Sequence, residues 1–261
     1  MVNKTEMLEL LESARSAIPE DVDLFNRIRP EVQRLADSGN PYFQEVVGAA
    51  ALEIDKDYGK AYRYLKLAAD AGVSSAQRGL GYLLTEGLGC EKDPKLAAAL
   101  FRMAAESGDV VAKFNLAGMY LRGEGVPESE EKGIRLLEEA SAEGLDPASV
   151  QLADIKASVE DYAGARGILE RIVPEGDVPS RSAKNLAAMC YQGLGGPVDK
   201  AKALGSSLKM AELGDRDGLG YGKTFAGELT TDEIRKAAVW AKVDDWYEAF
   251  LAYARDASGQ A

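Results

Sequence analysis

Residues 112–126 read AKFNLAGMYLRGEGV, a pattern that recurs at residues 76–89 with Leu84 in the place of Tyr120. An alanine and a leucine four residues apart lie on one side of a helix. The small side chain lets a neighbouring helix approach, and the large one fills the groove beside it. The glycines that end the segment permit a tight reversal of the chain. We therefore predict a first helix followed by a turn in each copy.

A second helix is predicted after each turn, because a good N-cap residue is followed by a small residue four positions later and a large one after another four. The N-cap positions are Asp57, Asp93, Ser129, Asp161 and Asp199. Only the last copy departs from this, with Ser207 at the large position. A glycine in the left-handed conformation is expected to close each second helix. These closing glycines are Gly72, Gly108, Gly144, Gly176 and Gly214, spaced 36, 36, 32 and 38 residues apart.

This recurrence predicts a stacked-repeat solenoid and not a globular enzyme core. We assign residues 1–39 to N-terminal capping helices or a divergent repeat, 40–228 to the repeats and 229–261 to C-terminal capping helices. A capping-box pattern at residues 230–233 opens the last segment. That segment carries Trp240, Trp246, Tyr247 and Phe250.

The repeated residues resemble the Sel-one-like repeat family, a branch of the tetratricopeptide-type helical solenoids. The likeness extends over about residues 40–228, and it is strongest at residues 112–126. The resemblance implies an all-α, right-handed superhelix of stacked antiparallel helix pairs. It also implies that partners bind on the concave side, which the first helices line.

Positions between the motif residues are free to vary and are expected to carry recognition. The predicted contact residues are Arg78, Tyr82, Phe114, Asn115, Arg122, Gln151, Asp154, Lys184 and Asn185. Aromatic residues and arginine dominate binding hot spots, so Tyr82 and Phe114 are the foremost candidates. The alternative for Phe114 is that its ring packs between helices.

The formal net charge of the 261 residues is −12, with a pI of about 4.7. Nucleic acid and anionic membranes are disfavoured partners, and a basic protein is electrostatically favoured. Acidity that serves only solubility is the alternative.

We see no secretory signal and no apolar run of about 18 residues. With only two cysteines, the chain is expected in a reducing cytoplasm. We also expect a monomer.

The sequence predicts no catalytic chemistry. It contains no histidine, which removes the commonest general base and most zinc sites. We expect no metal and no cofactor. Residues 217–224 nearly match a phosphate-binding loop, but Asp217 would oppose phosphate, and a helix is the preferred interpretation. Cys90 is either a reactive thiol or an inert small side chain.

The leading interpretation is a non-catalytic adaptor or scaffold that binds a protein partner on its concave face. A sharper version is an immunity-type inhibitor of a bacterial toxin or effector, for which acidic charge is suited. The alternatives are an enzyme or small-ligand binder that uses the solenoid groove, and a structural protein that assembles through its aromatic C-terminal segment.

Overall fold

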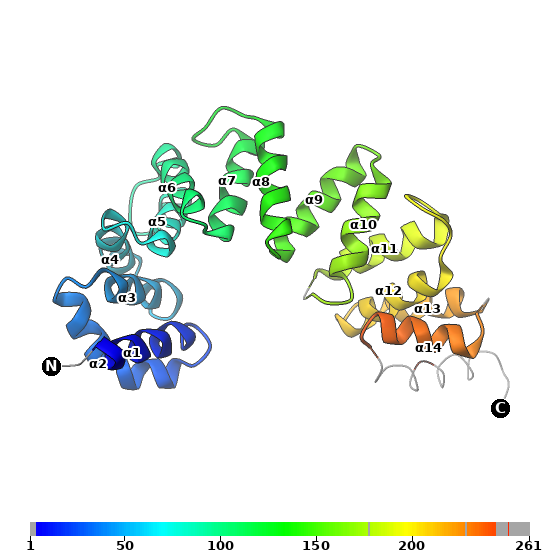
Figure 1. The fold of residues 1–261 in the computed structure, drawn as a ribbon, viewed down its shortest axis with the longest axis horizontal. Coiled ribbons are helices and arrows are strands. Elements are labelled where there is room, and N and C mark those ends of the chain that lie inside the picture. Colours follow the sequence, from blue (N-terminus) through cyan, green and yellow to red (C-terminus); the bar gives the residue numbers. More distant parts are fainter. Residues whose placement is uncertain (1–3, 177, 228, 244–249, 251–261) are drawn as a thin grey trace. The chain divides into compact units, whose positions relative to one another are not determined.

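The computed structural model describes residues 4–176, 178–227, 229–243 and 250, and these form helices and turns without a strand (Figure 1). The helices of these residues are α1 (Lys4–Ser16), α2 (Val22–Asp37), α3 (Pro41–Glu53), α4 (Tyr58–Asp70), α5 (Ser74–Glu86), α6 (Pro94–Glu106), α7 (Val110–Arg122), α8 (Glu130–Ala142), α9 (Asp146–Ser158), α10 (Tyr162–Ile172), α11 (Ser180–Gln192), α12 (Lys200–Glu212), α13 (Asp217–Ala226) and α14 (Thr231–Trp240). The predicted all-α fold is confirmed.

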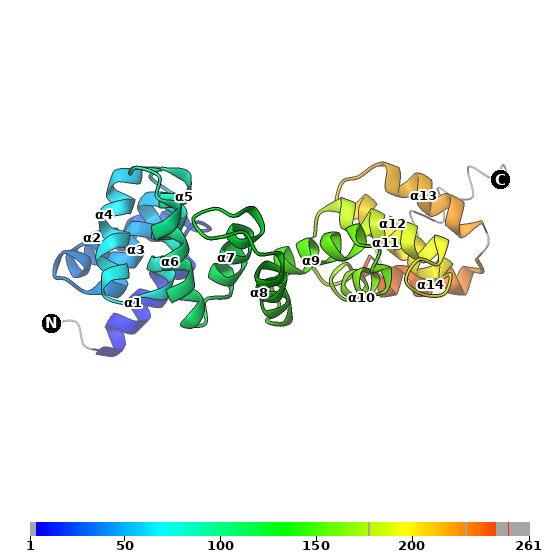
Figure 2. The ribbon, with the colours of Figure 1, turned by 90° about the horizontal axis from the view of Figure 1, so that it is seen from above.

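The chain divides within α8, between Glu139 and Ala140, into two compact units. In unit 1 each helix from α1 to α6 packs on the next, and the first helices α1, α3 and α5 also contact one another in order (Figure 2). In unit 2, α10 packs on α9, and α12 packs on α11, α13 and α14. Odd-numbered helices are thus the first helices of the repeats, and even-numbered ones the second. The division into capping and repeat segments stays a prediction.

The N-caps explain where the second helices begin. Each predicted cap side chain accepts a hydrogen bond from the backbone N–H three residues further on. These bonds satisfy donors that a helix start would otherwise leave unpaired. The Thr230–Glu233 capping box at the start of α14 is also formed.

The packing positions of the second helices are buried as predicted. Ala61, Ala97, Ala165 and Ala203 have no exposed surface. The large residues four positions later, among them Leu65 and Phe101, are also buried. At the equivalent position of α8, a Cβ on Gly133 would meet Leu121 and the Ala117 carbonyl of the preceding helix α7, so a neighbouring helix lies close to this face.

Ala97→Leu is expected to lower the free energy of unfolding by roughly 1–3 kcal/mol, because a well-packed crossing has no room for three more carbons. Ala97 lies in the same cluster as Leu80, Phe101 and Leu116. Thermal melts of the variant and the wild type would measure the loss. An unchanged melting temperature would contradict the placement of Ala97 at a helix crossing.

Four of the five predicted closing glycines, all except Gly176, have φ between 86° and 90°, and Gly39 closes α2 in the same way. The prediction for Gly176 was wrong. Helix α10 ends at Ile172, four residues before Gly176, whose N–H donates to the Ile172 carbonyl and whose φ is not positive. Pro174 has no N–H to continue the helical ladder, so this unit ends by a different turn.

Three first helices end in paired glycines, and the second glycine of each pair also allows close contact with the preceding repeat. These second glycines are Gly89, Gly125 and Gly195. A Cβ on Gly125 would overlap the Pro94 carbonyl at the start of α6 in the preceding repeat. Gly89 lies in the same way on Tyr58, and Gly195 on Tyr162. In each case a loop backbone rests on the first turn of the previous second helix, where only glycine fits.

The turns after α3 and α9 are short and contain no glycine. Lys56 and Glu160 take left-handed φ values of 53° and 62° in the turns after α3 and α9. Lys242 does the same after α14, with φ of 55°. Residues 217–224 lie in α13, which confirms the helical interpretation. Phe250 is buried, whereas Trp246 and Tyr247 lie outside the described residues.

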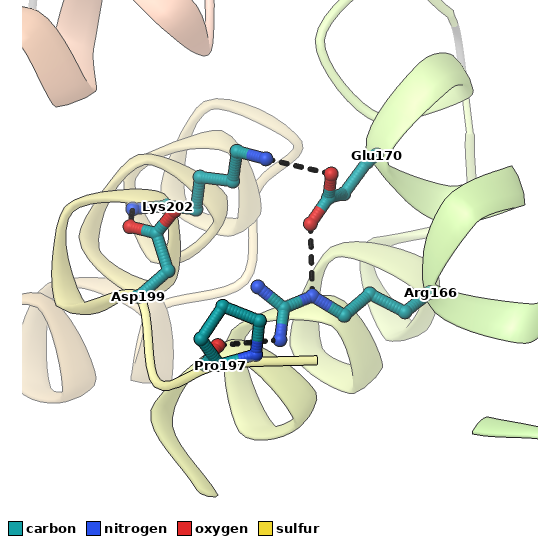
Figure 3. A network of polar contacts seen from close by, with 5 residues as sticks. All are labelled: Arg166, Glu170, Pro197, Asp199 and Lys202. Carbon is teal, nitrogen blue, oxygen red and sulfur yellow. Dashed lines mark hydrogen bonds and ion pairs between the residues drawn. The ribbon is translucent and has the colours of Figure 1, made fainter. Parts of the chain in front are cut away.

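A buried arginine joins two elements of unit 2 (Figure 3). The Arg166 side chain is only 6% exposed, and it donates to Glu170 Oε1 and to the Pro197 carbonyl, each at 2.8 Å. Lys202 Nζ lies 2.6 Å from the other Glu170 oxygen. Burial alone would raise the pKa of Glu170, but the hydrogen bonds from Lys202 and Arg166 outweigh it and hold that pKa below its usual value. The network ties α10 to the loop that leads into α12.

Candidate functional site

A groove of about 820 Å³ runs along the first helices of unit 1. Its walls come from α1, α3 and α5, with Ala71, Gly72 and Val73 of the turn before α5. We call it the N-terminal groove. Its principal polar lining residues are Arg15, Tyr42, Glu45, Glu53 and Arg78.

Each arginine of the N-terminal groove is held by a carboxylate. Arg15 donates twice to Glu45 Oε2, at 2.9 and 3.1 Å, and its guanidinium lies 5.9 Å from the centre of the Tyr42 ring. Arg78 donates to Asp109 at 2.9 Å. Asp109 also accepts from the Ala112 N–H as the N-cap of α7. These contacts fix the directions of both guanidinium groups.

Two tyrosines give this face exposed aromatic surface. Tyr42 is 52% exposed, and Tyr82, one turn beyond Arg78 on α5, is 44% exposed. A tyrosine combines a large apolar ring with a hydroxyl and loses little conformational freedom on binding, which suits contact with another protein.

Of the predicted contact residues in unit 1, Arg78 alone is among the residues that line the N-terminal groove. Phe114 and Asn115 are half-buried on α7. Arg122 is exposed at the end of α7 and pairs with Glu124 at 2.9 Å. Phe114 is therefore neither fully exposed nor fully packed between helices.

The other predicted residues belong to unit 2. Gln151 and Asp154 are half-buried on α9, and Asp154 accepts from Arg181 at 3.4 Å. Lys184 and Asn185 are exposed on α11. Lys184 Nζ lies 5.5 Å from the centre of the Tyr221 ring.

An aromatic cluster beside Lys184 was not predicted. The rings of Tyr191 and Phe225 have centroids 4.8 Å apart, and Tyr221 stacks on Phe225 at 6.4 Å. These residues join α11 to α13. Because α13 lacks a clear repeat motif, the sequence offered no register that would place Tyr221 beside α11.

The described residues contain no group of three or more histidine, cysteine or acidic side chains placed to hold a metal ion. Cys90 is half-buried and donates to the Leu83 carbonyl, and burial raises the pKa of its thiol. That shift reduces the thiolate fraction and favours the inert interpretation. In the part of the chain that the structure describes, no helix is long and apolar enough to cross a bilayer.

Comparison with known families gives four matches to the Sel1 repeat, at residues 50–73, 74–109, 110–145 and 180–215. Together these segments make up just over half of the chain. The chain belongs to the Sel1 repeat family. The matched Sel1 repeats end next to the left-handed glycines that close α4, α6, α8 and α12.

Two curated relatives match part of this Sel1 repeat chain. They are DAP3-binding cell death enhancer 1 of Rattus norvegicus and that of Mus musculus, 33% and 32% identical over 102 residues. The match covers 38% of this chain and 19% of either relative. The chain thus spans about a fifth of the length of these relatives.

Solved Sel1 repeat structures share the fold. The c5321 protective antigen of uropathogenic Escherichia coli superposes with a TM-score of 0.69 at 24% identity, over 90% of this chain and 53% of that one. A Sel1 repeat protein of Oxalobacter formigenes gives a TM-score of 0.61 at 22% identity, over 76% and 82% of the two chains. At these identities the likeness shows the solenoid fold alone.

Sequence reasoning missed Arg15, Tyr42 and Glu45, which form one wall of the N-terminal groove. A positional signal exists for Glu45. It is the fifth residue after the N-cap of its first helix, and so is Arg78 in the next Sel1 repeat. The same position holds Phe114, Val150 and Lys184 in later first helices. Comparing this position in the repeat that begins at Pro41 would have identified Glu45.

Proposed function

We propose that this chain is a non-catalytic adaptor that binds a protein partner along the first helices of unit 1. Sel1 repeat proteins generally mediate protein–protein interaction. The observation that carries the proposal is the N-terminal groove, in which Tyr42 is exposed beside oriented arginines and Tyr82 extends the surface. Exposed aromatic residues beside arginine are typical of interface hot spots.

The net charge of −12 supports a partner with a basic surface, because complementary charge accelerates encounter. Such a complex would weaken as ionic strength rises. An immunity-type inhibitor of a basic bacterial enzyme is one form of this hypothesis, and it rests on charge alone. Both cysteines are free, which supports a reducing compartment such as the cytoplasm.

Replacing the two exposed tyrosines is expected to weaken partner binding. Tyr42→Ala combined with Tyr82→Ala should raise the Kd about tenfold or more, because truncated aromatic hot spots typically cost 2 kcal/mol or more. The partner would be captured from the native host with the full chain as bait and identified by mass spectrometry. The Kd would then be measured by calorimetry with the purified partner.

Leu67→Ala is the matched control, since Leu67 is 48% exposed but lies on the second helix α4. Its Kd should equal that of the wild type. If the tyrosine variant bound the partner as tightly as the wild type did, the proposed surface would be wrong.

A further inference from the structure

A second, smaller pocket of about 300 Å³ lies between α6, α7 and α8, within unit 1. Its lining includes Arg102 from α6, Lys113 from α7, and Lys132 and Arg135 from α8. We call it the basic pocket. None of its lining residues contributes to the N-terminal groove, and none belongs to the predicted contact set.

Positive charge predominates in the basic pocket although the chain as a whole carries −12. The carboxylate of Glu139 serves two of the cations, with Lys113 at 3.7 Å and Arg135 at 3.2 Å. Glu106 is the acidic residue among those that line the pocket. The lining residues themselves comprise four cationic side chains and one carboxylate, so positive charge predominates among them.

Two of the four cations contact Tyr120, one at its hydroxyl and one at its ring. Arg102 Nη2 donates to the Tyr120 hydroxyl at 3.5 Å, and Lys132 Nζ lies 5.3 Å from the centre of the same ring. Leu116 and Leu136 add apolar surface beside Tyr120. The pocket thus combines apolar surface with cationic side chains, a combination suited to a hydrophobic side chain flanked by acidic ones.

We propose that the basic pocket is a docking site for an acidic peptide segment of a partner protein, one that carries a large hydrophobic side chain between carboxylates. A volume of about 300 Å³ is at the lower end of ligand sites and suits one such side chain. The hydrophobic residue packs on Tyr120, Leu116 and Leu136, and the carboxylates pair with Arg102 and Lys132. This site goes beyond the proposed function and does not depend on what the N-terminal groove binds.

The test uses the full chain and the fluorescein-labelled peptide Gly-Glu-Glu-Phe-Glu-Glu-Gly, followed by fluorescence anisotropy. The wild type should bind it saturably, and the same peptide with alanine in place of phenylalanine should bind at least about fivefold more weakly. Arg102→Glu combined with Lys132→Glu should raise the Kd about tenfold or more, because attraction becomes repulsion at two positions.

The matched control is Lys95→Glu combined with Lys92→Glu, two exposed lysines at or just before the start of α6 and outside the basic pocket. This control makes the same change in net charge and should alter the Kd less than about threefold. Circular dichroism would verify that both variants keep their helices.

Absence of saturable binding, or equal losses of affinity in both double variants, would overturn the proposal. Equal displacement of the peptide by inorganic tripolyphosphate and by an unlabelled copy, with no dependence on phenylalanine, would instead show a general anion site and overturn the peptide assignment.

Discussion

Gly125→Ala is expected to lower the free energy of unfolding by about 3 kcal/mol, although the substitution adds a single methyl group. Two effects combine. Gly125 has φ of 70°, and a side chain in the left-handed region costs roughly 1–2 kcal/mol. Its Cβ would also overlap the Pro94 carbonyl, which is backbone and can move only if α6 moves with it. Overpacking of this kind adds roughly 1–3 kcal/mol.

Gly108→Ala separates the two effects. Gly108 has φ of 88°, but a Cβ there would meet nothing within 4 Å. We expect this control to lose only the conformational part, about 1 kcal/mol. Urea titrations followed by circular dichroism would compare both variants with the wild type. Equal losses for the two glycines would show that the loop does not rest on the preceding repeat.

The features that sequence predicted well are local ones. Whether Asp93 caps a helix depends on residues within one turn, and its side chain accepts from the Leu96 N–H as expected. Whether Ala97 is buried depends on a helical period that recurs along the chain. Such features need no knowledge of which helices become neighbours.

The features that sequence missed depend on distant neighbours or on a break in the period. Arg15 and Glu45 are 30 residues apart, and α1 carries no motif that sets its register against α3. The closing role given to Gly176 followed from spacing, whereas Pro174 ends the helical ladder earlier. Glu160 takes a left-handed φ that its residue type does not favour, because the shorter unit leaves no glycine at that turn.

Of the side chains that line the N-terminal groove, sequence reasoning selected only Arg78. Arg78 was identified because it occupies a variable position in a clear repeat. The basic pocket was not predicted, because its cations come from three helices and the sequence does not show that these helices bring them together. The net charge of −12 is a property of the whole chain and gives no indication of a local cluster of cations.

Arg166→Ala is expected to lower the free energy of unfolding by about 2–3 kcal/mol. The variant leaves the Pro197 carbonyl without its donor and leaves Glu170 with Lys202 as its remaining cationic partner. Removing one member of a buried charged pair is costly because the other charge stays desolvated. We expect a smaller loss than for a fully buried ion pair, because the Glu170 side chain is 26% exposed and water partly solvates its charge. Urea titration at pH 7 would measure it.

The matched control for this variant is Arg34→Ala, because Arg34 also pairs with a glutamate on its own helix but its side chain is 59% exposed. We expect no measurable loss from it.

The pH dependence of stability gives a second test of the role of Arg166. The folded pKa of Glu170 is depressed, so its stabilising contribution is present above the unfolded pKa, about 4.3, and is lost as the pH falls through the folded pKa. The difference in stability between the wild type and Arg166→Ala should therefore narrow as the pH is lowered from 7 to below about 4. A difference that stayed constant over this range would mean that Arg166 stabilises unit 2 by packing and by its bond to Pro197, and not through the charge of Glu170.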